Sequence, residues 1–144
     1  MIEYIANDPQ GTIMYQTDGI TYYKHSLLHT IDDLCESYLF SYEGYRKAVD
    51  HQLSIKHLIP IYLDEDTQLI PIKRYRDYDN IFINYQAISS VSEHDQGLMI
   101  GFISGREIYI KMSVYSFNQQ IEKLVKIRNT KVKHFHRLKD SKCL

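Results

Sequence analysis

The sequence predicts an α+β fold, in which a mainly antiparallel sheet, open or curled, is packed by one internal and one C-terminal amphipathic helix. Short apolar segments separated by turn residues recur along the chain, as is typical of antiparallel strands. Two other segments place apolar residues every three or four positions, as is typical of helices. Because the 144 residues contain no repeat or linker, we expect one domain that buries its own core.

The predicted strands begin at the N-terminus and resume after the internal helix. Within the first 24 residues, segments 12–15 and 20–23 flank Asp18-Gly19. This dipeptide favours a hairpin, because glycine accepts the positive φ that the turn requires. The remaining strands are expected at residues 58–63, 69–72, 81–84, 87–91, 98–103 and 107–112.

The internal helix is predicted to begin at Thr30, a residue type that caps helices. An apolar face follows it between Ile31 and Leu39, with residues spaced three and four apart. Gly44 is expected to end or interrupt this helix, since glycine is common just after a helix.

The C-terminal helix is predicted to begin at Ser116, with Gln119 as its capping-box partner. Its end is expected near residues 127–130, because a longer helix would place basic residues close to its apolar stripe. Residues 1–133 would then form the domain and residues 134–144 a basic, flexible tail. The expected buried stripe consists of Phe117, Ile121, Leu124 and Val125.

The charges are divided unevenly along the chain. Residues 1–72 carry four basic and eleven acidic side chains, whereas residues 111–144 carry nine basic and two acidic ones. Such a division indicates a nucleic-acid or membrane contact at the basic end. Alternatively, the basic end docks on the acidic half of the same molecule.

The sequence contains none of the common motifs of catalytic or metal-binding sites. The chain has no GxSxG nucleophile elbow, no phosphate-binding glycine loop, no HExxH and no CxxC. His134 and His136, interpreted as the only close histidine pair, lie in a basic segment without an acidic partner. We therefore expect no enzyme, no cofactor and no metal. Without a signal peptide or a membrane span of roughly 20 apolar residues, we expect a cytoplasmic protein.

Two segments resemble the competence transcription factor (ComK) family. Residues 41–48, Ser-Tyr-Glu-Gly-Tyr-Arg-Lys-Ala, are similar to its Ser-Tyr-x-Gly-Arg-Lys-Ala segment, with Tyr45 as an additional residue. Residues 113–120, Ser-Val-Tyr-Ser-Phe-Asn-Gln-Gln, are similar to its Ser-Tyr-x-Ser-Phe-x-x-Gln helix start. The resemblance runs from about Glu3 to Lys133 with nearly the same intervals. The chain resembles a short member that lacks the family's C-terminal tail.

The resemblance implies a bacterial transcription activator of competence, or DNA-uptake, genes. Such a protein would bind double-stranded A/T-rich promoter boxes as a homo-oligomer, largely through the minor groove, and would lie on the nucleoid when bound. RNA polymerase is a further candidate partner. Minor-groove binding needs arginine and lysine side chains rather than a recognition helix. Two alternatives remain: an interaction module resembling PH domains, and a truncated modulator of a full-length family member.

The candidate DNA contacts are the basic side chains near the two resembling segments, near the 69–72 strand and on the last helix. For each of them the alternative is a solvated face or an ion pair with a local acid. The predicted contacts are Arg46, Lys47, Lys56, Lys73, Arg74, Arg76, Lys123, Lys126, Arg128, Lys131 and Lys133.

Overall fold

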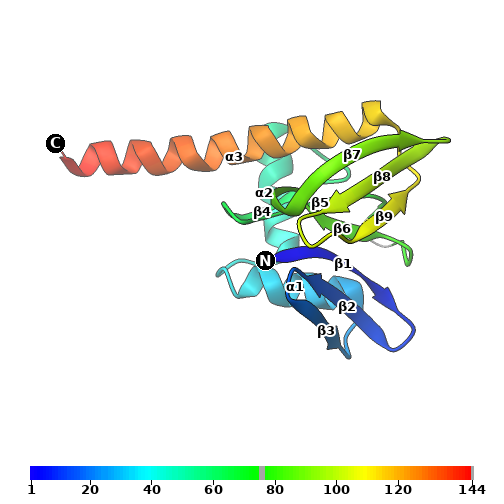
Figure 1. The fold of residues 1–144 in the computed structure, drawn as a ribbon. Coiled ribbons are helices and arrows are strands. Elements are labelled where there is room, and N and C mark those ends of the chain that lie inside the picture. Colours follow the sequence, from blue (N-terminus) through cyan, green and yellow to red (C-terminus); the bar gives the residue numbers. More distant parts are fainter. Residues whose placement is uncertain (75–76, 144) are drawn as a thin grey trace.

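The computed structural model describes the backbone of residues 1–74 and 77–143, and the side chains of residues 1–74 and 77–133. Within these residues the chain forms three α-helices, one short 3-10 helix and two antiparallel sheets (Figure 1). The predicted α+β class is therefore confirmed. None of the described helices has the length and apolar character needed to cross a membrane.

Six strands form the larger sheet. Their order is β3 (Gly19–Tyr23), β2 (Gly11–Gln16), β1 (Ile2–Asp8), β6 (Ile81–Asn84), β5 (Thr67–Pro71) and β4 (Ile61–Asp64). The expected hairpins are present as β2–β3 and β4–β5. At the centre β1 pairs with β6, which is distant in sequence, and Tyr4 lies opposite Ile83. Ile5, Phe82 and Ile83 are fully buried there, so the core lies against these central strands.

The smaller sheet contains three strands and is joined to the larger one by a buried carboxylate. It consists of β7 (Ile88–His94), β8 (Gly97–Phe102) and β9 (Glu107–Ile110), and the 3-10 helix η1 (Tyr85–Ala87) precedes it. Glu3 Oε1 accepts hydrogen bonds from Arg106 Nη1 at 2.7 Å and from Ser104 Oγ at 2.8 Å. A buried carboxylate is costly without such partners, so this contact fixes the β8–β9 turn against β1.

The single internal helix that we predicted is two helices, α1 (Leu27–Glu36) and α2 (Tyr42–Leu53). Thr30 does not cap α1, because Ser26 does so and accepts the His29 N–H. Gly44 does not end a helix. It lies in the first turn of α2 and donates its N–H to the capping Ser41 hydroxyl at 3.0 Å. A serine cap therefore begins each helix.

The last helix, α3 (Val114–Cys143), is longer than predicted at both ends. Ser113 begins it, since its side chain accepts the Ser116 N–H at 3.1 Å. At the other end the helix passes residues 127–130 and continues through most of the predicted tail. In Figure 1 its C-terminal part projects beyond the sheets. The expected end was wrong because Arg128 and Lys131, near the apolar stripe, find partners on other elements.

The buried face of α3 contains a glutamine that connects three parts of the chain. Phe117, Gln120, Leu124 and Ile127 are buried, whereas the expected Val125 is 44% exposed. Gln120 Nε2 donates to Leu58 O at 2.9 Å and to Pro71 O at 3.1 Å. One side chain thus holds α3 against the 58–60 segment and against the end of β5.

We predict that Gln120→Ala lowers the free energy of unfolding by about 2–3 kcal/mol, because two carbonyls lose their hydrogen-bond donor in a buried place. Urea denaturation followed by circular dichroism measures the change. The matched control is Gln119→Ala on the exposed face of the same helix, with an expected change within about 0.5 kcal/mol. Equal stability of the two variants would contradict the role given to Gln120.

Candidate nucleic-acid interface

Four of the predicted basic residues surround one hollow, which we call the central hollow. Its volume is about 100 Å³, and it lies between the first turns of α2, the 56–59 segment and the chain that follows β5. The lining residues are Tyr42, Arg46, Lys56, His57, Leu58, Ile59, Pro71, Lys73 and Arg74.

A buried asparagine fixes the backbone that carries Lys73 and Arg74. Asn80 Oδ1 accepts the N–H groups of Ile72 at 3.2 Å and Lys73 at 2.9 Å, so the chain after β5 keeps a defined course. Asn80 Nδ2 is buried and has no hydrogen-bond partner among the described residues. An unpaired buried donor costs about 1–3 kcal/mol, which the three bonds to Oδ1 help to offset.

The opposite wall of the central hollow depends on two residues with left-handed backbone conformations. Ser54 ends α2 with φ 56°, and its N–H donates to Asp50 O at 2.8 Å. Leu58 has φ 48°. These two reversals fold the short 54–58 segment back, and Lys56 thereby lies beside the hollow rather than continuing α2.

Three further hollows share residues with the central one. The hollow between α1 and α2 shares Arg46 with it, the one between the end of α2 and α3 shares Lys56, and a third shares Lys73 and Arg74. We call the lining of all four the basic surface. The structure thus brings together seven predicted contacts: Arg46, Lys47, Lys56, Lys73, Arg74, Lys123 and Lys126.

Some of these charges have partners within the molecule. Lys47 Nζ lies 3.2 Å from Glu43 Oε1, and Lys73 is paired with Asp79. The hydrogen bond from Lys73 lowers the pKa of the Asp79 carboxyl below its usual value. All four side chains are substantially exposed, so these ion pairs contribute little and can be exchanged for an anionic ligand.

Lys56 and Arg74 are exposed and have no ion-pair partner among the described residues. The Arg46 guanidinium lies over the Tyr42 ring, 5.4 Å from its centroid, which limits its orientations. Two solvated cations and one positioned guanidinium around a shallow hollow make a site for anions. Such groups bind phosphates as point charges and through the guanidinium fork.

Lys123 connects α3 to this surface. Its Nζ donates to His57 O at 2.9 Å, and its partial burial lowers the pKa of the ammonium group. Lys126, less than one turn further, is exposed and lines the same hollow. Lys123 therefore helps to hold α3 against the 54–58 segment and also contributes a positive charge, whereas Lys126 contributes only a positive charge.

Of the other four predicted contacts, three are described by the structure and are not part of the basic surface. Arg128 Nε faces Glu65 Oε2 at 3.5 Å, next to the β4–β5 hairpin. Lys131 is half-buried on the same side of α3, and Lys133 is exposed without lining any of the four hollows. Arg76 lies outside the described residues.

The Lys131 side chain packs against aromatic rings and does not lie on a solvated face of the helix. Its Nζ donates to Tyr62 O at 2.9 Å and lies 5.0–5.3 Å from the ring centroids of Phe40, Tyr45 and Tyr62. Desolvation there lowers the pKa of its ammonium group. Because the Lys131 ammonium group contacts both the Tyr62 carbonyl and the aromatic rings, this side chain helps to hold α3 against α2 and β4.

Charge alone did not indicate Tyr42 and His57 as members of this surface. Tyr42 supports Arg46, and the His57 carbonyl accepts from Lys123. Tyr42 lies in the 41–48 segment that resembles the ComK family, and His57 lies within the longer resemblance from Glu3 to Lys133, which was the one signal that included it.

The fold and the surface define an α+β protein with several clustered cations on one face. Residues 2–136, nearly the whole chain, match the model of a family described as ComK protein, and the chain therefore belongs to the ComK family. This is a family of competence-related transcription regulators. No curated protein and no solved structure matches the chain.

We predict that Lys131→Ala lowers the free energy of unfolding by about 1–2 kcal/mol, through loss of the stem's packing and of the hydrogen bond to Tyr62. Lys131→Met should lower the free energy of unfolding by a smaller amount, because an apolar stem still packs against the rings. Thermal denaturation measures both, with Lys133→Ala as the exposed control on the same helix. A Lys131→Ala variant as stable as Lys133→Ala would contradict this placement.

Proposed function

We propose that this protein is a DNA-binding transcription factor that activates competence genes by binding A/T-rich promoter boxes, largely through the minor groove. It would act in the cytoplasm, on the nucleoid, as a homo-oligomer that also contacts RNA polymerase. The observation that carries the proposal is the basic surface, which unites seven cations from α2, the 54–58 segment, the chain after β5 and α3.

The arrangement of these cations suits a nucleic-acid backbone. Phosphate contacts position a protein on a duplex, and each contact needs an exposed cation that can exchange solvent for phosphate oxygens. Lys56, Arg74 and Lys126 are exposed in this way. Arginine is also the side chain that enters narrow A/T-rich minor grooves, where the negative potential is enhanced. Arg46 and Arg74 border the central hollow and are the candidates for this role.

Binding to two duplexes tests the proposal directly. We expect the full chain to prefer a fluorescent duplex with two spaced A/T boxes over a G/C-rich duplex of equal length. Anisotropy titrations at several salt concentrations should give a steep dependence, with log K against log[salt] falling at a slope of about −5 for five or six phosphate contacts. Flat or absent binding would refute the proposal. Binding to anionic liposomes in its place would favour the PH-like interaction module.

A pair of double variants tests which surface is used. Lys56→Ala with Arg74→Ala removes two exposed cations from the central hollow. We expect weaker binding to both duplexes and a salt slope smaller in magnitude by about two, one for each lost phosphate contact. The control, Lys24→Ala with Lys111→Ala, makes the same change in net charge at two exposed lysines that line none of the four hollows.

Equal weakening in both double variants would mean that net charge, not the basic surface, governs binding. An unchanged slope in the first variant would remove the central hollow from the interface. Circular dichroism of both variants shows whether they are folded, which makes a loss of binding attributable to the missing cations.

A further inference from the structure

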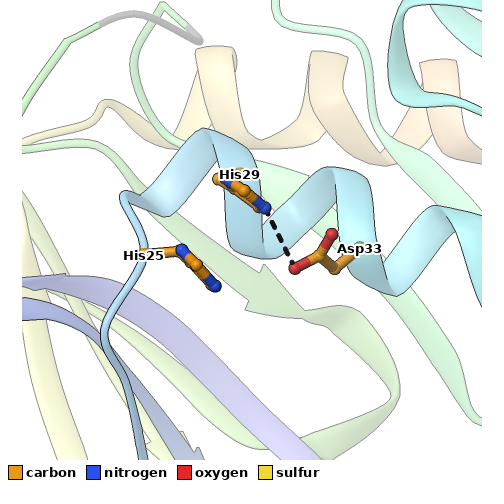
Figure 2. Close-up of side chains that lie close together, drawn as sticks. All are labelled: His25, His29 and Asp33. Atoms are coloured by element: carbon orange, nitrogen blue, oxygen red, sulfur yellow. Dashed lines mark ion pairs between the residues drawn. The ribbon is translucent and has the colours of Figure 1, made fainter.

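Two histidines and an aspartate lie together on an exposed face at the start of α1. Figure 2 shows His25 on the segment that leads into α1 and His29 and Asp33 on the helix, with the three side chains close together. His29 Nε2 lies 3.4 Å from Asp33 Oδ2, and the two imidazole rings stack with centroids 4.0 Å apart and planes 10° apart. One potential ligand atom from each residue lies within 4.8 Å of the other two.

The spacing of four residues explains this face. His25 precedes the capping Ser26, and His29 and Asp33 follow one and two turns later on the same side. Our interpretation that His134 and His136 are the only close histidine pair was therefore wrong, because it considered neighbours in sequence and not on a helix.

Buried hydrogen bonds fix the backbone of His25, which lies before the helix. Thr12 Oγ1 of β2 donates to His25 O at 2.7 Å, and Thr30 Oγ1 of α1 lies 3.1 Å from Thr12 Oγ1. Both threonines are almost completely buried. The position of His25 relative to α1 is thus set by the core, although its side chain is exposed.

We propose that His25, His29 and Asp33 form a surface site for a divalent transition-metal ion of the Zn²⁺ type. Ligands in a tetrahedral zinc site lie about 3.3 Å apart, given bond lengths of about 2.0–2.1 Å, so the His29–Asp33 separation fits without movement. His25 reaches the ion by side-chain rotation. Three protein ligands leave a fourth position for water.

The donor set determines which ion is preferred. Imidazole nitrogen with one carboxylate suits Zn²⁺, Ni²⁺ and Cu²⁺, whereas Mg²⁺ and Ca²⁺ require mainly oxygen ligands. The positive end of the α1 dipole opposes a cation at this place. Asp33 reduces that cost, and so does the neighbouring Asp32 carboxylate, which accepts the Tyr42 N–H at 2.9 Å. We infer an exchangeable site rather than a structural one.

Calorimetric titration of the full chain with Zn²⁺, after treatment with EDTA, tests the site. The site variant is His25→Gln with His29→Gln. The control is His51→Gln with His94→Gln, which removes two exposed histidines elsewhere, from α2 and β7. We expect one Zn²⁺ to bind the wild type and the control with the same affinity, and an affinity at least about tenfold lower for the site variant. Asp33→Asn should weaken binding in the same direction.

A second measurement distinguishes Zn²⁺ binding at this site from Zn²⁺ binding at other histidines. Zn²⁺ should raise the thermal midpoint of the wild type and of the control, since a ligand that binds the folded state stabilises it. The site variant should have the same midpoint without metal and no increase with metal. Zn²⁺ affinity retained in the site variant would overturn the proposal. The result does not depend on DNA binding, so the two proposals fail separately.

Discussion

The arrangement of the basic surface depends on the side-chain amide of Gln120. This buried group donates from α3 to the carbonyls of Leu58 and Pro71, and so joins the two chain segments that form opposite walls of the central hollow. Lys123 follows on the same helix and donates to the His57 carbonyl beside Leu58. One buried polar side chain thereby helps to set the relative positions of cations that are far apart in sequence.

Gln120 has this role because one of the two carbonyls lies outside regular secondary structure and the other lies at the end of a strand. Leu58 has a left-handed conformation, and Pro71 is the last residue of β5. Backbone carbonyls at such places require a donor from elsewhere, since buried polar groups are stable only when hydrogen-bonded. A primary amide supplies two donors from one nitrogen. Gln120 therefore satisfies both carbonyls while it occupies a place on the apolar stripe of α3.

The sequence predicted the fold class, the hairpins and the existence of the last helix, because each depends on local periodicity. It did not predict the division into α1 and α2, since Gly44 was interpreted as a terminator although its N–H bonds the Ser41 cap. The length of α3 was missed for a different reason. Lys131 is compatible with a buried helix face only when Tyr62, distant in sequence, supplies an acceptor. Contacts of this kind are set by tertiary packing and leave no local pattern.

The uneven charge distribution supported two interpretations, a nucleic-acid contact and docking on the acidic half, and the structure shows the docking for one part of α3. Arg128 and Lys131 face Glu65 and Tyr62 at the acidic β4–β5 hairpin, so these charges are used within the fold. Lys123 and Lys126 line a hollow together with Lys56. Internal docking thus orients the helix, and in this orientation Lys123 and Lys126 lie beside Lys56 of the 54–58 segment. The two interpretations are therefore compatible, because internal docking positions the cations that the proposed nucleic-acid contact requires.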